Sequence, residues 1–464
     1  MKSDRRRARW ILVLAIAAGP IFAGARDAVA QPARTPGAVP PSAQTTAPLT
    51  LEECVDMALR NSASLAISRA QLAASEGSRM SSWNAFLPSA SLQSAYVHTT
   101  SQFDTPRINE AGEVVSGSTR ATSKYYTART GVTESLIAPS GWYRFWGAGS
   151  DVLASRQGLR ATRAETIYQV RQGYFLLVRA ILLERVSAEA LQVSDEQLSR
   201  SQALFDVGSV ARSDVLQASV NRASAERVEI SARNAIEQQR ALLAALMGLD
   251  LEKPLEVQTD VGETPPSDDD ESALVREALE IRPEVRQARA QTESARLRYR
   301  SAFWSLWPYL DGSLFWQRQE NTFGKIRNLS ELDRNAQWGF QIGLNWNVFD
   351  GLSSAGRVKS AAAGVEQARQ AERLEQLNTA VGIREALVAI KNAREELAAA
   401  EHGVSLAEEN LRLQQALYKN GGGTIIELNT AQSALTKARS DQVDARISLH
   451  LALAQLDRAV GSEK

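Results

Sequence analysis

The sequence predicts a mainly helical chain with a small membrane-spanning β part, built from one unit that occurs twice. Residues 337–348 alternate large apolar side chains with Gly, Gln and Asn. Two proline-free stretches, 143–205 and 357–418, are rich in Ala, Leu, Glu, Gln and Arg, which favour helix. The same order of residues recurs about 220 positions later, which indicates duplication.

The segment 337–348 has the pattern of a transmembrane strand. Successive side chains of a strand point to opposite faces, so one face here is apolar and the other is polar and uncharged. A strand that crosses a membrane needs about 9–11 residues with this alternation. A half-buried strand of a soluble sheet is the alternative for this segment alone. The residues expected to face lipid are Trp338, Phe340, Ile342, Leu344, Trp346 and Val348.

The chain begins with features of an exported protein. Residues 1–30 have a basic start, an apolar run at 10–22 and the sequence Ala-Val-Ala at 28–30, which predicts a secretory signal peptide. Residues 31–48 are rich in proline and are expected to form a disordered tail. No later stretch holds 18 consecutive apolar residues, so any later membrane crossing must be made of strands.

Composition gives no sign of catalysis or of nucleic-acid binding. The chain has 53 basic and 53 acidic residues, and the signal peptide holds six of the basic and two of the acidic ones, which leaves a net charge of −4. Cys54 is the only cysteine and is expected to be a small buried hydrophobe. His98, His402 and His450 lack metal-ligand spacing. We therefore predict no catalytic, cofactor-binding or metal-binding residues, with a serine hydrolase as a minor alternative.

The two copies are expected at 49–248 and 272–461, joined by a proline-containing acidic linker at 249–271. Ala58-Leu59 recurs as Ala278-Leu279, 220 residues later. Beyond the strands the offset falls to 213, where Arg144 recurs as Arg357. Each copy reads as a helix, two strands, a very long helix and a returning helix.

The first helix of copy one is expected to start at a capping box, Thr50 with Glu53, and to continue unbroken to about Phe86. Its counterpart covers about 272–307, with an interruption at Arg282-Pro283. The predicted strands are about 89–98, 127–137, 309–319 and 337–348, with polar loops at 99–126 and 320–336 between them.

The long helices determine the predicted architecture. At 1.5 Å per residue they span on the order of 90–100 Å, whereas each returning helix, ending near Gly248 or Gly461, reaches only about 54 Å. The first helix of each copy would cover the remaining half. Two short helices placed end to end then match one long helix.

Four strands cannot close a membrane barrel by themselves. An open edge in lipid leaves backbone groups unpaired at several kcal/mol each. Two copies would give eight strands around an interior largely filled by side chains, so three copies and twelve strands are favoured. Tryptophans cluster where helices meet strands, as at a membrane interface, although core packing there is the alternative. These are Trp83, Trp142, Trp146, Trp304 and Trp307.

The order of elements resembles the TolC-type outer-membrane efflux protein family over essentially all of 49–461. The matching motifs are Leu49-Thr50-Leu51-Glu52-Glu53, Ala58-Leu59-Arg60-Asn61, Arg282-Pro283-Glu284-Val285, Gly208 with Asp214-Val215-Leu216-Gln217-Ala218, and Gly421 with Glu427-Leu428. The resemblance implies a homotrimer in the outer membrane, with a twelve-strand β-barrel continued by a twelve-helix α-barrel in the periplasm. It also implies a periplasmic adaptor and, through it, an inner-membrane pump. Ser62 and Gly423 depart from residues common in the family.

The resemblance also implies that the helical tips contact the adaptor and close the inner mouth of a passive conduit. We hypothesise that Asp214 and Glu427 ring the axis there. Their alternative roles are a first-turn acid of a helix and, for Glu427, a capping box with Thr424. Gly208 and Gly421 are expected as helix C-caps with positive φ. The tip residues are Phe205, Gly208, Ser209, Arg212, Asp214, Tyr418, Gly421, Gly423, Thr424 and Glu427.

Two other functions fit part of the sequence. An exported coiled-coil adaptor without a barrel would explain the leader and the long helices, but not the paired strands with aromatic residues at their ends. A barrel-only porin is disfavoured because so much of the chain is helical. The cargo and the partner pump are not encoded in any pattern that we recognise.

Overall fold

The computed structural model describes residues 48–108, 110, 112, 114–251, 255–260, 262, 270–326, 335–420 and 422–461. The predicted signal peptide and most of the proline-rich tail lie outside these residues. Contacts divide the chain into Met1–Pro48 and Leu49–Lys464. The second of these units holds the helices and the strands.

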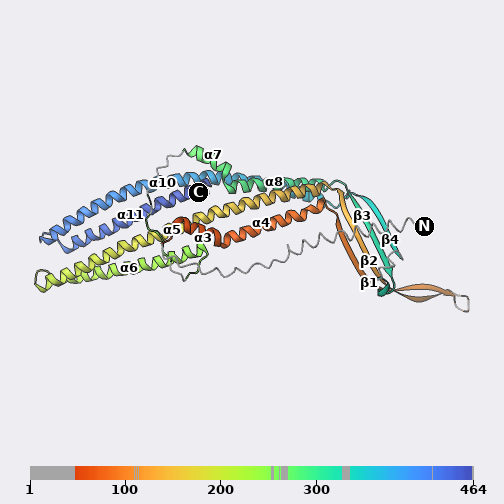
Figure 1. Ribbon diagram of the computed structural model, residues 1–464, viewed down its shortest axis with the longest axis horizontal. Coiled ribbons are helices and arrows are strands. Elements are labelled where there is room, and N and C mark those ends of the chain that lie inside the picture. Colours follow the sequence, from red (N-terminus) through yellow and green to blue (C-terminus); the bar gives the residue numbers. More distant parts are fainter. Residues whose placement is uncertain are drawn as a thin grey trace. The chain divides into compact units, whose positions relative to one another are not determined.

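Helices make up most of this unit (Figure 1). Those of the first copy are α3 (Leu51–Asn61), α4 (Ala63–Ser81), the 3-10 turn η1 (Ser82–Ala85), α5 (Pro139–Asp206) and α6 (Arg212–Met247). Those of the second copy are α7 (Glu271–Ile281), α8 (Pro283–Trp304), the single turn α9 (Phe323–Ile326), α10 (Ser353–Lys419) and α11 (Ile425–Val460). The helix α5 begins four residues before the expected start because Pro139 occupies its first turn, where a missing N–H has no cost.

The prediction of one unbroken helix from Thr50 to Phe86 is wrong. The helix breaks at Ser62, whose φ of −59° and ψ of 125° match the −58° and 125° of Arg282 at the equivalent point of copy two. Proline after Arg282 explains the second break. In the first copy no proline is present, and the break coincides with the place where the end of α6 packs against Asn61. The capping box between Thr50 and Glu53 is confirmed.

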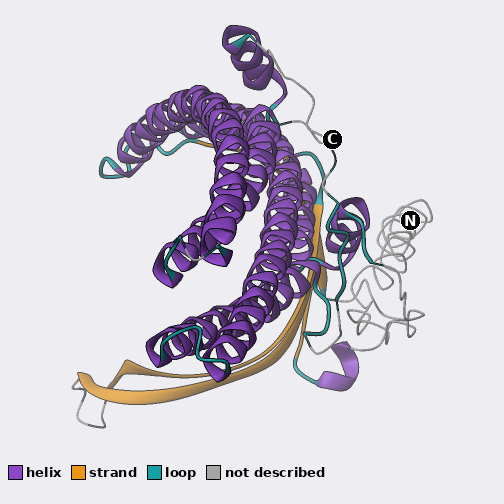
Figure 2. Ribbon diagram, turned by 90° about the vertical axis from the view of Figure 1, so that its left-hand side faces the viewer, coloured by secondary structure: helices purple, strands orange, loops and turns teal. Residues whose placement is uncertain are grey.

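The two long helices form the frame of the helical layer. At the end near the sheet, α4 and α8 pack against α5, and α8 also contacts α10. At the other end, α6 and α11 pack against α5, and α11 returns along α10. Figure 2 shows these helices side by side in a curved layer. The short helices thus follow one another along the long ones, as the lengths predict.

The four strands form one antiparallel sheet in the order β1-β2-β3-β4. They are β1 (Ser89–Ile108), β2 (Val114–Ile137), β3 (Tyr309–Glu320) and β4 (Ala336–Asn345). The two copies meet in this sheet, where β2 pairs with β3 from Tyr126–Glu320 to Ile137–Leu310. Among the described residues, the outer edges of β1 and β4 have no strand partner.

The strand boundaries differ from the prediction in two places. Most of the expected loop 99–126 is strand, because its Thr, Ser and Val residues continue the ladder to Ile108–Val114. Since β3 ends at Glu320, this ribbon of two strands extends beyond the four-stranded sheet. The strand β4 ends earlier than expected, so Trp346 and Val348 lie beyond it. Trp346 instead donates from its indole N–H to the Leu306 carbonyl at 3.1 Å.

The core repeats with the chain. In copy one, buried Ala58, Val170, Leu177, Leu243 and Met247 pack together. In copy two, equivalent positions are occupied by Ala278, Ile383, Ile390, Leu456 and Val460. Cys54 belongs to the first cluster and is fully buried, as expected. Burial raises the pKa of its thiol to about 11, so it remains an unreactive thiol at neutral pH.

Candidate functional site

The sheet has one strongly apolar face that is exposed. Trp338, Phe340, Ile342 and Leu344 of β4 have exposed fractions of 63%, 75%, 62% and 70%. The register places them opposite Trp316, Leu314, Gly312 and Leu310 of β3, so these pairs share the face. On the other face, Gln337 pairs with Gln317, and their side-chain amides are 2.9 Å apart in a hydrogen bond. An apolar face of this kind on β3 and β4 fits contact with lipid, although the register also places Glu134 of β2 on it, opposite Gly312.

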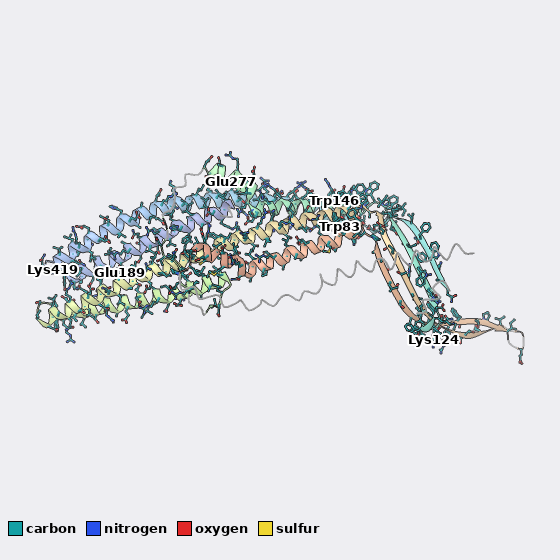
Figure 3. All side chains as sticks on the ribbon, viewed as in Figure 1. Trp83, Lys124, Trp146, Glu189, Glu277 and Lys419 are labelled. Atoms are coloured by element: carbon teal, nitrogen blue, oxygen red, sulfur yellow. The ribbon has the colours of Figure 1, made fainter. Side chains whose placement is uncertain are left out.

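The predicted interfacial aromatics gather where the helices adjoin the sheet. Figure 3 labels Trp83 and Trp146 at this end of the helical layer. Trp83 meets Phe145 edge to face, with ring centroids 4.8 Å apart, and Trp146 meets Tyr143 at 5.3 Å. Trp304 lies 6.1 Å from Trp307. Trp142 is half-buried on α5. Side chains that are partly packed and partly exposed suit a membrane interface, which remains a prediction for these residues.

The first tip turn is built around Gly208. Its φ is +76°, its N–H donates to the Phe205 carbonyl at 2.8 Å, and the Ser209 N–H donates to the Leu204 carbonyl at 2.8 Å. These two bonds make a Schellman motif, which satisfies the last carbonyls of α5. The predicted C-cap at Gly208 is therefore confirmed. Gly421, its expected counterpart, lies outside the described residues.

The second tip turn is closed by the capping box at the start of α11. The Glu427 N–H donates to Thr424 Oγ1 at 3.3 Å, and the Thr424 N–H donates to Glu427 Oε2 at 2.8 Å. The predicted capping role of Glu427 is confirmed. The Thr424 N–H and the Thr424 hydroxyl, which donates to the same Oε2 at 3.0 Å, lower the pKa of the Glu427 carboxyl group. Gly423 lies so close to α10 that a Cβ would stand 3.2 Å from the Leu417 Cβ. The turn therefore folds tightly back on α10.

Asp214 occupies the first turn of α6, where its charge favours the helix dipole. It lies near Tyr418 of α10, so the structure brings two predicted tip residues from different copies together. Burial raises the pKa of the Tyr418 phenol, and the Asp214 carboxylate raises it further. Among the described residues, no hydrogen bond or ion pair joins Asp214 to Glu427. Phe205 and Arg212 flank the same turn, with Phe205 39% exposed.

Ion pairs between the two helical hairpins were missed by sequence reasoning. Arg179 of α5 donates twice to Asp444 of α11, at 2.7 and 3.0 Å. Arg439 of α11 bonds Glu189 of α5 at 2.8 Å. These partners lie 250 or more positions apart in the chain. Both long helices carry many charges of each sign, so the sequence alone does not show which residues pair. The fold identifies the partners.

Across the described ranges, no three His, Cys, Asp or Glu residues are grouped as metal ligands. No helix in the described part of the chain has the length and apolar character that a membrane span requires.

Comparisons with known proteins agree with this architecture. The family described as outer membrane efflux protein matches residues 54–249 and 274–462. The chain is 23% identical to the outer membrane efflux protein BepC of Brucella suis over 369 residues, 77% of each chain. It is 24% identical to the outer membrane protein TolC of Vibrio cholerae over 363 residues, covering 77% of this chain and 82% of that one.

Solved structures show the same fold. The CmeC outer membrane channel of Campylobacter jejuni has a TM-score of 0.76 at 18% identity, covering 89% of this chain and 87% of that chain. The outer membrane protein VceC of Vibrio cholerae has a TM-score of 0.74 at 18% identity, with 89% and 96% covered. The family consists of channel proteins, which favours a channel over an adaptor without a barrel. The chain therefore belongs to the outer membrane efflux protein family, and it is an outer-membrane channel component of a tripartite efflux system with its helical part in the periplasm.

Proposed function

We propose that three copies of this chain form a passive conduit, with their sheets joined into one twelve-strand barrel and their helices into one tunnel. The observation that carries the proposal is a sheet with one exposed apolar face, whose edge strands β1 and β4 have no further strand partner in the described part of the chain. In lipid these edges must pair, and β4 of one copy with β1 of the next would close the barrel. The polar face, with Gln337, Gln341 and Asn345, would then line the interior.

The edge helices support the same assembly. Within the described part of the chain, α6 packs on α5 and α3, and α10 packs on α11, α8 and α7. The opposite side of each helix faces no other helix of this part of the chain. Both carry large apolar side chains that are about half exposed or more, which is unusual for a surface that remains in water. Those on α6 are Leu216, Val220 and Ile230, and those on α10 are Leu374, Leu377, Val381, Val388, Leu406 and Leu413. A neighbouring copy would cover them.

We assign the tip turns to gating and to the periplasmic adaptor, through which an inner-membrane pump would supply the energy. The segments 205–214 and 418–427 lie at the free end of the helices, where Figure 3 labels Lys419. Closed tips would place one Asp214 and one Glu427 per copy near the axis. Like charges at close range repel, so hydrogen bonds and packing such as that of Tyr418 must hold the closed state.

The remaining segments complete the proposal. Residues 1–30 would be removed on export, 31–48 would form a tail, and 249–271 would link the copies 49–248 and 272–461. Trp83, Trp142, Trp146, Trp304 and Trp307 would lie at the periplasmic face of the membrane. The ribbon at the other end of the sheet would then extend outside the cell. No step of this mechanism requires a catalytic residue or a cofactor.

The test is the mass of the detergent-extracted oligomer together with planar-bilayer conductance of the same sample. We expect a trimer with a small, rarely open conductance. A monomer without conductance would contradict the shared barrel.

The gate is tested by Glu427→Gln and Asp214→Asn. Glutamine retains the capping box, so Glu427→Gln removes charge while leaving the start of α11 intact. Because each change removes repulsion between like charges at the closed tips, we expect both variants to lower the open probability without changing the trimer mass. Thr424→Ala is the matched control, because it removes the cap and keeps the carboxylate. Unchanged conductance in both charge variants would show that these acids serve the helices only.

A further inference from the structure

A groove runs along α5 between α4 and α8. It consists of two adjoining cavities of about 560 and 670 Å³, which share Asp151 and Arg298. Small hydroxyl and amide side chains line most of it. They include Ser78, Ser81 and Ser82 from α4 and η1, Ser140 from α5, and Ser301 from α8. Neither the conduit nor the tips account for this lining.

Three arginines line the cavity nearer the sheet, one each from α5, α8 and α10. Arg298 bonds Asp151 at 2.8 and 2.9 Å, so its charge is balanced within the groove. Arg357 lies 3.6 Å from Asp350 and remains 59% exposed. Arg144 is exposed, and no ion pair joins it to a carboxylate among the described residues. Positive charge therefore exceeds negative charge in this cavity.

The groove lies on the side of α5 away from the membrane aromatics. Its α5 residues Arg144, Gly147 and Asp151 recur every three or four positions, which is one face of a helix. Phe145 and Trp146 follow Arg144 by one and two residues, about 100° and 200° around the axis. In the proposed trimer the aromatics face outward, so the groove opens to the interior of the channel.

Duplication multiplies the charge at this level. Arg144 and Arg357 are 213 positions apart, which is the offset of the long helices, and both line the same cavity. Three copies would bring six such guanidiniums to one level of the conduit, just below the barrel. A guanidinium offers a fork of donors that matches carboxylate and phosphate, and serine hydroxyls can donate beside it.

We propose that this groove is a binding site for the anionic groups of transported molecules, carboxylate or phosphate, and that its arginines shift the selectivity of the conduit toward anions against the acidic tips. The proposal rests on the trimeric channel. Cargo would be held there by charge-assisted hydrogen bonds to Arg144 and Arg357 and would remain close to the entrance of the barrel.

The test uses the detergent-extracted trimer in planar bilayers. A KCl gradient gives a reversal potential, and inorganic phosphate or succinate is then added to measure block of the current. We expect block by phosphate, by succinate or by both, which distinguishes the two sources of negative charge. Arg144→Gln and Arg357→Gln should each shift the reversal potential toward cations and weaken block about tenfold, the loss typical of one charge-assisted bond.

The matched control is Arg300→Gln. Arg300 lies on α8 two residues after Arg298 but stacks over the Tyr143 ring at 5.8 Å, on the aromatic side. It should leave selectivity and block unchanged. Arg144→Lys should retain the reversal potential but not the full block. If all variants carried current with the same selectivity, the anion-binding proposal would be wrong and the channel proposal would still hold.

A sample without current would count against the channel instead. In that case, ³¹P relaxation of inorganic phosphate in the presence of the trimer tests whether the groove binds phosphate. Broadening that is lost in Arg144→Gln but not in Arg300→Gln supports the site, and equal broadening in both overturns it.

Discussion

Gly461 closes α11 directly against Arg282. A Cβ at Gly461 would stand 3.1 Å from the Arg282 Cα, and its φ of +84° lies in the left-handed region. The first copy has the same joint, where Gly248 has a φ of +67° and a Cβ would stand 2.9 Å from the Asn61 carbonyl oxygen. Each returning helix therefore ends at the break in the first helix of its own copy.

Replacing either joint glycine with alanine should destabilise the protein for two reasons, backbone strain and overlap. Gly208→Ala is the control, because its φ is +76° but nothing lies within 4 Å of the added Cβ. The left-handed conformation alone costs about 1–2 kcal/mol. We expect Gly248→Ala and Gly461→Ala to lower the melting temperature of the trimer further than Gly208→Ala does. Equal shifts in calorimetry would show that the joint relaxes without cost.

The two joints have different chemistry at equivalent positions. In copy two, Arg458 of α11 lies 2.9 Å from Glu165 and 2.5 Å from Glu284, and Arg282 lies 3.2 Å from Glu284. In copy one, Ser62, Ser64 and Ala245 stand at the positions of Arg282, Glu284 and Arg458. There the Ser62 and Ser64 hydroxyls are 2.8 Å apart. One joint thus depends on charge and the other does not.

The charged joint should make stability depend on acid pH. Burial raises the pKa of Glu284, but the Arg458 and Arg282 guanidiniums outweigh it and the pKa falls below its ordinary 4.5. A lowered folded-state pKa gives stability that is complete above about pH 4.5 and is lost as pH falls through the folded value. We expect Glu284→Gln to flatten the wild-type decline in melting temperature below that pH.

Ser64→Ala is the matched control in copy one and should keep the wild-type slope, since no charge titrates there. At neutral pH, Arg458→Met should approach the ~3–5 kcal/mol cost of breaking a buried pair, reduced because both side chains are 18% exposed. If Glu284→Gln still showed the full fall in melting temperature at acid pH, other carboxylates would be responsible for that fall.

Local rules predicted the elements whose signals lie within a few residues. The capping boxes at Thr50 and Thr424 and the glycine cap at Gly208 depend on neighbouring backbone groups, and all three formed as expected. The break at Ser62 did not follow from its neighbours. It coincides with contact from Gly248, nearly two hundred positions away, so no local signal could place it.

The candidate site shows the same division. Alternation in 337–348 predicted the apolar face, because a strand fixes side-chain direction by position alone. It did not predict that β4 ends at Asn345. The next residue, Trp346, donates its indole N–H to the carbonyl of Leu306, which follows α8. Asp214 and Tyr418 were both expected at the tips, but their proximity depends on how the two helical hairpins pack through α11 and α5. For Arg144 and Arg357, the sequence showed only that they occupy equivalent positions of the two copies, and not that they line one cavity.

The assignment of faces on β4 predicts opposite effects for adjacent residues. Ile342→Lys would place a charge on the apolar face, at a cost of about 2–4 kcal/mol near the membrane midplane. Gln341→Lys places the same charge on the polar face, where we expect little effect on stability. Heat-resistant trimer on gels, measured for both variants after extraction, decides between them. Loss of trimer with Gln341→Lys alone would reverse the faces.

The ribbon beyond the sheet should be dispensable for assembly. Its strands pair only with each other from Ser101–Ala121 to Ile108–Val114, and β3 contributes nothing beyond Glu320. Replacing 101–121 with Asn-Gly joins Thr100 to Thr122, which already face each other, through a turn that suits a two-residue hairpin. We expect the shortened chain to form trimers with wild-type melting temperature and conductance. The control deletion, 92–130, also removes β2 residues that pair with β3, and it should abolish the trimer. If both deletions abolished the trimer, the ribbon would contribute to folding.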